Sequence, residues 1–148
     1  MFSPSFTSQF ARSGAGALAH AYRRVGVETS VEDASPHRLV ELLFDGYAES
    51  IVQARGAMRN GQVEVKGRAI GRAARIVDEG LKAGLNMQQG GRLAADLHSL
   101  YEYLTVRLTL ANIRNDERIL EECHTLMEPL RQAWKAIGPQ VEATRKAA

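Results

Sequence analysis

Apolar residues recur at helical spacing in the first ordered stretch of the chain. Val40, Phe44, Tyr47, Ile51, Ala54 and Met58 follow one another at alternating intervals of four and three residues, and Leu39, Leu42 and Leu43 widen the stripe. This is the period of an amphipathic helix that faces a core. Ser35 is a preferred N-cap and Pro36 fits the first helical position, while Asn60-Gly61 is a common stop signal. The pattern predicts a helix that begins at Ser35-Pro36 and ends at Asn60-Gly61.

A second helix is predicted from about Lys66 to Leu85. Its apolar positions are Ala69, Ile70, Ala73, Ala74, Ile76, Val77, Leu81 and Leu85, and glycines stand at positions 67, 71, 80 and 84. An interior glycine costs a helix about 1 kcal/mol relative to alanine. One explanation is that small residues let another helix approach closely. The alternative is a weak, locally mobile helix.

The third and fourth stripes are joined by a short connector. After a loop over residues 86–91, the third stripe consists of Leu93, Leu97, Leu100, Leu104, Leu108 and Ala111. Asn115 or Asp116 can cap the next helix. The fourth stripe consists of Ile119, Cys123, Leu126, Leu130, Ala133 and Ile137, with Leu120, Met127 and Trp134 on its flank. Two long amphipathic helices joined so closely favour an antiparallel hairpin.

Two prolines interrupt the last stretch. Pro129 predicts a kink near residues 125–129 without a chain break, because the stripe keeps its phase across it. Gly138-Pro139 is expected to end the helix. The sequence therefore predicts an all-α fold, an antiparallel four-helix bundle with a partly ordered N-terminal arm. Residues 1–34 form the flexible arm, residues 35–138 the bundle and residues 139–148 a solvated tail.

Composition narrows the function classes. The chain has 148 residues, 45% of them hydrophobic and 24% charged, which is the balance of one ordinary soluble domain. A net charge of only +2 is weak support for a nucleic-acid binder, and no stretch predicts membrane insertion. The single cysteine, Cys123, cannot form an internal disulfide, which indicates a reducing compartment. No acidic residue precedes Glu28, which is also typical of an organellar transit peptide. The other interpretation of this region is a mobile arm with an apolar segment near Tyr22.

The polar residues do not form a convincing catalytic or metal site. Glu121 and His124 give one Glu-x-x-His pair, but a carboxylate-bridged metal site needs two such pairs and further glutamates. The sequence that follows His124 or His98 lacks the lysine and glycine expected of a phosphotransfer histidine. Cys123 lies on the core stripe, where a thiol is a small hydrophobe. We therefore expect no enzyme activity, no metal and no cofactor.

Two surface features remain. Arg68, Arg72 and Arg75 stand at i, i+4 and i+7 and form a basic edge, which is read either as a site for an acidic partner or as a solvated face with Arg75 paired to Glu79. Apolar side chains also extend beyond one face of the first, second and third helices. Such a surplus usually marks a partner site, and the natural ligand for grooves between helices is an amphipathic helix. Self-assembly of a structural or regulatory helical protein explains the same surplus.

Short segments spread over roughly residues 20–138 together resemble the flagellar secretion chaperone family, FliS. They are Ala21-Tyr22 with Val25, Val27 and Thr29, residues 35–46, Lys66-Gly67, residues 80–85, Gly90-Gly91, residues 100–104, Arg107-Leu108, Ala111-Asn112, Asn115-Asp116 and Trp134. The resemblance implies a cytosolic bacterial chaperone that binds the disordered C-terminal segment of flagellin, prevents premature polymerisation and delivers it to the flagellar type III export gate. It implies no nucleotide and no metal.

The resemblance also suggests where flagellin binds. Partners would be the flagellin C-terminal segment, an export gate component and other flagellar regulators, with the chain as a monomer or weak dimer. In the family, the segment matching Tyr22 can cover part of the flagellin groove when cargo is absent. The residues expected to contact flagellin are Tyr22, Val25, Ala73, Val77, Leu81, Leu85, Tyr101, Leu104 and Leu108. The alternative for those of the second and third helices is that they lie in the closed interior of the bundle.

Overall fold

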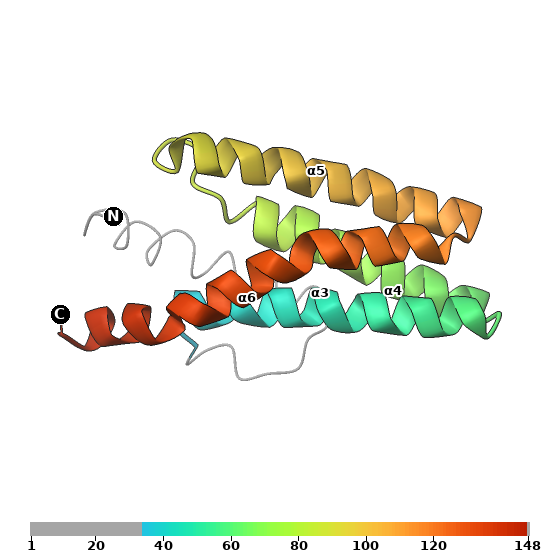
Figure 1. The fold of residues 1–148 in the computed structure, drawn as a ribbon, viewed down its shortest axis with the longest axis horizontal. Helices are drawn as coiled ribbons and strands as arrows, with labels where there is room; N and C mark the ends of the chain where they lie inside the picture. The colour runs from blue at the N-terminus through green and yellow to red at the C-terminus, as the bar shows by residue number, and fades with distance from the viewer. Residues whose placement is uncertain (1–33, 148) are drawn as a thin grey trace.

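Four antiparallel helical segments form the described part of the chain. The computed structural model describes residues 34–147 and the side chains of residues 34–141, so the predicted arm, with Tyr22 and Val25, lies outside the described residues. The elements are α3 (Pro36–Arg59), α4 (Val63–Arg75) continuing into the π-helical segment η3 (Ile76–Lys82), α5 (Gly91–Arg114) and α6 (Glu117–Ala147). Figure 1 shows successive helices running in opposite directions. Over this range there is no strand, and the predicted all-α four-helix bundle is confirmed.

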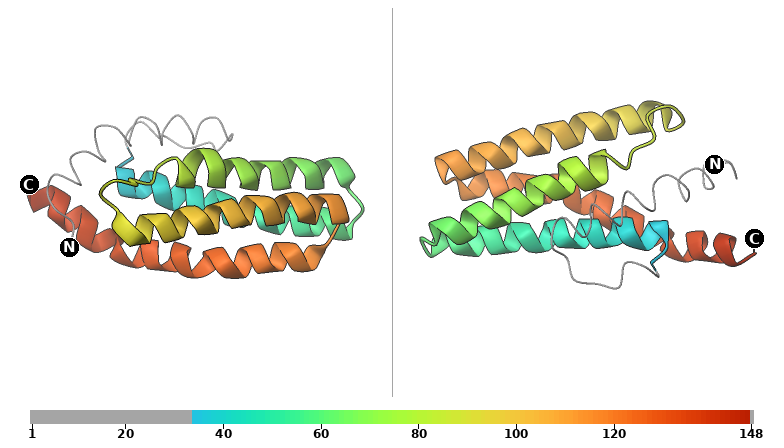
Figure 2. Two further views of the ribbon diagram at one scale, coloured as in Figure 1. Left: turned by 90° about the horizontal axis from the view of Figure 1, so that it is seen from above. Right: turned by 180° about the vertical axis from the view of Figure 1, so that it is seen from behind.

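The helices are arranged as a ring. α3 packs mainly on α4 and α6, and α5 packs on α4, η3 and α6. α3 and α5 therefore occupy opposite corners of the bundle, as the two views of Figure 2 show. This arrangement decides which apolar faces are covered.

Both ends of α3 form as the sequence predicts. The backbone N–H of Arg38 donates to Ser35 Oγ at 3.1 Å, and Pro36 occupies the first turn. At the other end Gly61 adopts φ +69°, a left-handed conformation that costs glycine little. Its two neighbouring helices can therefore reverse direction within three residues.

The second helix differs from its predicted bounds. It begins at Val63 rather than Lys66, changes to π-helical hydrogen bonding over Ile76–Lys82, and leaves Leu85 in the connector. The π turn keeps Ile76, Val77, Gly80 and Leu81 buried. A Cβ built at Gly80 would lie 3.1 Å from the Leu43 methyl groups, so the glycine permits close contact with α3, as predicted for a small residue.

A buried lysine joins the start of α4 to the α5–α6 corner. Lys66 Nζ donates to the carbonyl oxygen of Asn112 and to Asn115 Oδ1, both at 3.0 Å. Asn115 is left-handed at the end of α5, and Asp116 Oδ1 accepts from the Arg118 N–H at 3.0 Å. Of the two candidate caps, Asp116 therefore caps α6 and Asn115 ends α5.

The last helix is longer than predicted. α6 continues without a break through Pro129, and through Gly138 and Pro139 to Ala147, so the predicted stop at Gly138-Pro139 is wrong. Tertiary contacts explain the continuation. The Trp134 ring stacks on His37 with centroids 4.7 Å apart, and its Nε1 donates to the His37 carbonyl at 2.9 Å. Gly138 is buried against the same histidine, which would lie 2.9 Å from an added Cβ.

The core face of α6 agrees only in part with the predicted one, since Ile119 and Cys123 of the predicted stripe are buried. Leu120, Cys123 and Met127 are buried, whereas Leu126 is 37% exposed and Ala133 is exposed. The core face therefore includes Leu120 and Met127 of the predicted flank beside Cys123 of the predicted stripe. In α3, by contrast, Leu39, Leu42 and Leu43 are buried together with the main stripe, so its apolar surplus is not exposed.

A tyrosine hydroxyl links α3 to α6 inside this core. Tyr47 OH donates to the Cys123 carbonyl at 3.1 Å, and burial raises the pKa of the phenol well above its ordinary value. Tyr47→Phe should lower the free energy of unfolding by about 1 kcal/mol, the usual contribution of one such hydrogen bond. Urea denaturation measures this change. Tyr103→Phe is the control. It removes a hydroxyl that donates to Glu122 on the exposed face of α5, where water can replace the lost hydrogen bond, so it should cost less. Equal costs for the two variants would contradict a buried link.

Candidate binding surface

Most residues predicted to contact flagellin lie in the interior. Tyr22 and Val25 fall outside the described residues, and Leu85 is partly buried in the connector. The remaining six, which are Ala73, Val77, Leu81, Tyr101, Leu104 and Leu108, are at most 5% exposed and belong to one core cluster. The expected open groove over these positions is therefore wrong for this structure, because α4, η3 and α5 pack against one another there. Their contact with flagellin stays a prediction.

The two buried titrating groups near these positions, Tyr101 and Cys123, are uncharged at neutral pH. Burial raises the pKa of the Tyr101 phenol to about 12. The pKa of the Cys123 thiol is also raised to about 12, mainly by burial and further by the negative charge of Glu122. A neutral thiol is a poor nucleophile and a poor metal ligand. Glu121 is exposed and His124 half-buried on α6, and residues 34–141 contain no cluster of three potential metal ligands. Cys123 therefore acts as a core residue.

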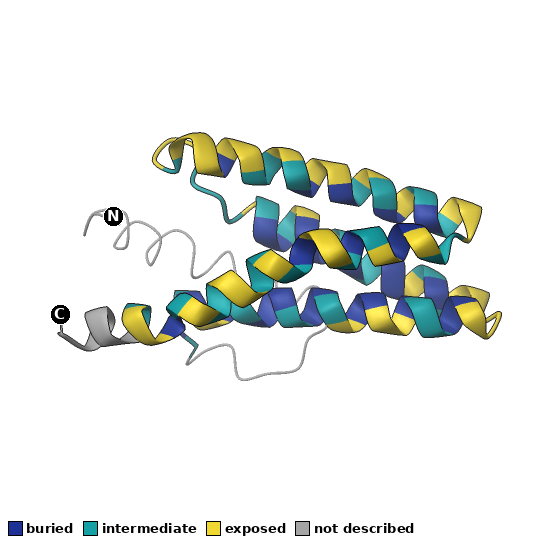
Figure 3. Ribbon diagram, viewed as in Figure 1, coloured by how far each residue is buried: buried dark blue, intermediate teal, exposed yellow. Residues whose placement is uncertain are grey.

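A row of accessible apolar residues lies on the outer side of α5. Tyr103, Val106, Leu110 and Ile113 follow one another at intervals of three, four and three residues, and we call them the outer stripe. Val106 is 59% exposed, Ile113 74% and Tyr103 45%, while Leu110 is partly buried. Figure 3 shows exposed positions along the side of α5 that faces away from the rest of the bundle. The helix thus has two apolar stripes, one in the core and one facing solvent.

Part of the outer stripe was foreseeable. The sequence predicts an apolar surplus on this helix but does not single out Ile113. It also assigns Leu93 to the core stripe, which is wrong because Leu93 is 69% exposed. The signal for Ile113 was its heptad spacing from Val106. A second stripe with helical spacing can therefore be found from the sequence once the first has been assigned.

A polar cluster attaches the outer stripe to α6. Tyr103 OH donates to Glu122 Oε2 and Arg107 Nε donates to Glu122 Oε1, each at 2.7 Å. These hydrogen bonds hold the pKa of the Glu122 carboxyl below its usual value, with Arg107 as the larger cause. The contacts fix the orientation of α5 so that its outer stripe is presented on a rigid helix.

No described helix is both long enough and apolar enough to cross a membrane. The exposed apolar residues of α5 form a surface patch on a helix that also carries polar side chains. Such patches mark sites where another protein docks.

Comparison with known proteins identifies the family. The profile described as "Flagellar protein FliS" matches residues 18–141. The chain belongs to the FliS family. Its relatives include the flagellar secretion chaperone FliS of Salmonella typhimurium, which is 46% identical over 120 residues, covering 81% of this chain and 89% of the relative. The flagellar secretion chaperone FliSB of Pseudomonas aeruginosa is 43% identical over 117 residues, covering 79% and 92%. FliS of Bacillus subtilis is 31% identical over 108 residues, covering 73% and 79%.

The family resemblance predicted from the sequence is therefore confirmed. The match begins at residue 18 and so includes Tyr22 and Val25, which the structural description does not cover. It extends into the part of α6 beyond Pro139.

A matched pair of substitutions separates core from surface. Val77 is fully buried, so Val77→Glu should lower the free energy of unfolding by at least about 3 kcal/mol by leaving an unpaired charge in the interior. Val106→Glu places the same charge on the exposed side of α5 and should leave the melt nearly unchanged. Thermal denaturation followed by circular dichroism compares them. A Val77→Glu variant as stable as the parent chain would show that Val77 is accessible after all.

Proposed function

We propose that this chain is a flagellar secretion chaperone that binds the disordered C-terminal segment of flagellin in the bacterial cytosol. Binding keeps flagellin subunits from polymerising before export and delivers them to a component of the flagellar type III export gate. Membership in the FliS family supports the chaperone role. The role needs a binding surface but no catalytic group, metal or nucleotide. Other flagellar regulators are further partners in this proposal.

The observation that carries the proposal is the outer stripe of α5. A segment that folds on binding loses conformational entropy, which a continuous apolar surface can offset. An amphipathic helix would lay its own apolar face along Tyr103, Val106 and Ile113. The surface is open rather than enclosed, so a bound segment can also be released for export.

The test is calorimetric titration with a peptide that matches the C-terminal segment of flagellin from the same organism. Val106→Asp combined with Ile113→Asp should weaken binding roughly tenfold or more, because burial of one aliphatic side chain contributes about 1.5–3 kcal/mol. Val52→Asp, at an equally exposed valine on α3, is the matched control and should bind normally.

Two results would overturn the proposal. One is a parent chain that does not bind the peptide. The other is a parent chain that sediments as a tight oligomer, ignores the peptide and dissociates when Val106 is replaced. The second result would favour the alternative function, self-assembly of a structural or regulatory protein.

The segment near Tyr22 and Val25 is proposed to compete with flagellin for the chain. Removing residues 1–24 should then increase the affinity for the flagellin peptide without a large loss of bundle stability. The same calorimetric titration measures the affinity and a thermal melt measures the stability. Unchanged affinity would remove the competing role from this segment.

A further inference from the structure

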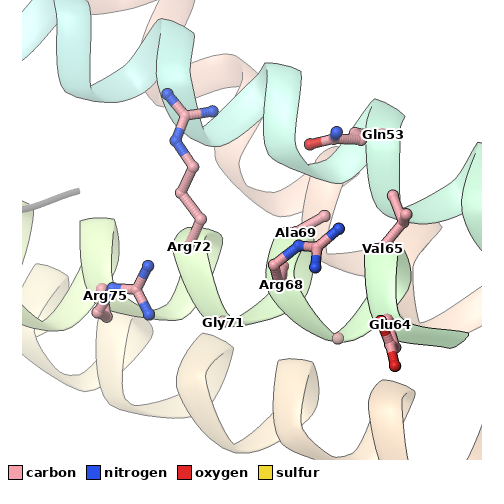
Figure 4. Close-up of a pocket in the computed structure, with 9 residues that line it drawn as sticks. Gln53, Glu64, Val65, Arg68, Ala69, Gly71, Arg72 and Arg75 are labelled. Atoms are coloured by element: carbon pink, nitrogen blue, oxygen red, sulfur yellow. The ribbon is translucent and has the colours of Figure 1, made fainter. Parts of the chain in front are cut away.

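A basic groove runs along the outer face of α4. It has a volume of about 670 Å³ and is lined by Gln53 of α3 and by Glu64, Val65, Gly67, Arg68, Ala69, Gly71, Arg72 and Arg75. Figure 4 shows the three arginine side chains distributed along one turn after another of α4, with Glu64 at one end. Their spacing over seven residues corresponds to a row about 10 Å long. The groove is therefore a short, elongated and positively charged surface.

Two of these arginines differ from most others in the bundle. Arg107 pairs with Glu122, Arg131 with Asp45 and Arg55 with Glu117. Arg68 and Arg75 are exposed, and across the described residues neither forms an ion pair or a hydrogen bond. The pair expected between Arg75 and Glu79 is thus absent there. Both guanidinium groups are available to an anion.

The third arginine is held in place. Arg72 Nη1 donates to Ser50 Oγ at 3.1 Å, and that hydroxyl donates to the Gly46 carbonyl at 2.8 Å. This contact directs Arg72 across the gap toward α3, as Figure 4 shows. The charge at the centre of the row therefore has a fixed position, which a flexible solvated face would lack.

The floor of the groove is open at the level of the helix backbone. An added Cβ at Gly67 would meet nothing within 4 Å, and at Gly71 it would meet only an atom of the Arg75 side chain, at 3.7 Å. Helix axes lie 8–10 Å apart depending on the side chains at the contact, so glycines permit the closer separations. A second helix can therefore approach α4 more closely here than at a position with larger side chains.

The charge identifies the kind of partner. Carboxylates at i, i+4 and i+7 of a helix would face the arginine row, and guanidinium–carboxylate pairs are strong and directional. A nucleic acid is less well matched, because the row is short, Glu64 lies at its end and the chain carries a net charge of only +2. We propose that this basic groove docks an acidic helix of another protein. This site is separate from the one that holds the flagellin segment.

The probe is a fluorescently labelled helical peptide with three glutamates spaced like the arginines and alanines between them. Its binding to the full chain is measured by anisotropy. A second peptide has the same composition, with the glutamates spread around the helix. The patterned peptide should bind more tightly than the scrambled one. Equal binding of the two peptides would assign the groove to polyanions in general and overturn the proposal. So would a short single-stranded oligonucleotide that displaces the labelled peptide as well as the unlabelled patterned peptide does.

Charge reversal tests the arginines. Arg68→Glu with Arg75→Glu should weaken binding of the patterned peptide on the order of tenfold, because two exposed ion pairs with the peptide are lost. The matched control is Arg92→Glu with Arg118→Glu, two side chains that are 94% and 90% exposed elsewhere on the surface. It changes the net charge equally and should leave the affinity close to that of the parent chain. Equal weakening by both double variants would contradict a local site.

A larger side chain at a glycine of the groove tests whether a second helix approaches α4 closely there. Gly67→Leu should weaken binding of the patterned peptide while leaving the thermal melt intact, because a Cβ at that position would meet nothing within 4 Å. Unchanged affinity would overturn helix docking on the glycines. The flagellin peptide is titrated in parallel and should bind the Arg68→Glu, Arg75→Glu variant normally. If that variant loses both peptides, the groove belongs to the flagellin site and the separate site proposed here does not exist.

Discussion

The structure depends on the burial of α3. This helix has apolar residues around more than one face, and Leu39, Leu43 and Ile51 are all essentially inaccessible. α4, η3 and α6 pack on it to cover that surface, whereas α5 packs on those three elements rather than extensively on α3 itself. Because α5 occupies the opposite corner, one of its two apolar stripes remains outside the bundle. The exposed stripe thus results from the way in which α4, η3 and α6 cover the apolar surface of α3.

This arrangement suits an exposed surface better than a pocket. The side chains at the positions expected to form a groove fill the interior, and they cannot leave it without opening the core. Native cores are packed densely, so such opening is costly. A partner helix that adds to the outside of α5 requires no such rearrangement. In the proposed function, binding on the surface of a preformed bundle leaves the ordering of the partner as the main entropic cost.

The sequence predicts the helices well because their start and stop signals are local. Ser35, Pro36 and Gly61 act within one turn, and each functions as expected. Pro139 fails as a stop because Trp134 and Gly138 pack on His37, a residue nearly a hundred positions earlier. The two stripes of α5 have the same spacing, so periodicity cannot say which one faces the core. The same limit applies to α6, where Leu120 rather than Leu126 is buried. Long-range packing decides these choices.

The most direct test of flagellin binding observes the flagellin segment rather than the bundle. An isotope-labelled peptide with the sequence of the flagellin C-terminal segment is disordered when free and gives poorly dispersed amide signals by nuclear magnetic resonance. On addition of the chain, the account predicts that these signals shift to helical values and saturate at one peptide per chain. Signals that stay unshifted in the presence of excess folded chain would contradict the claim that this bundle holds the unfolded end of flagellin.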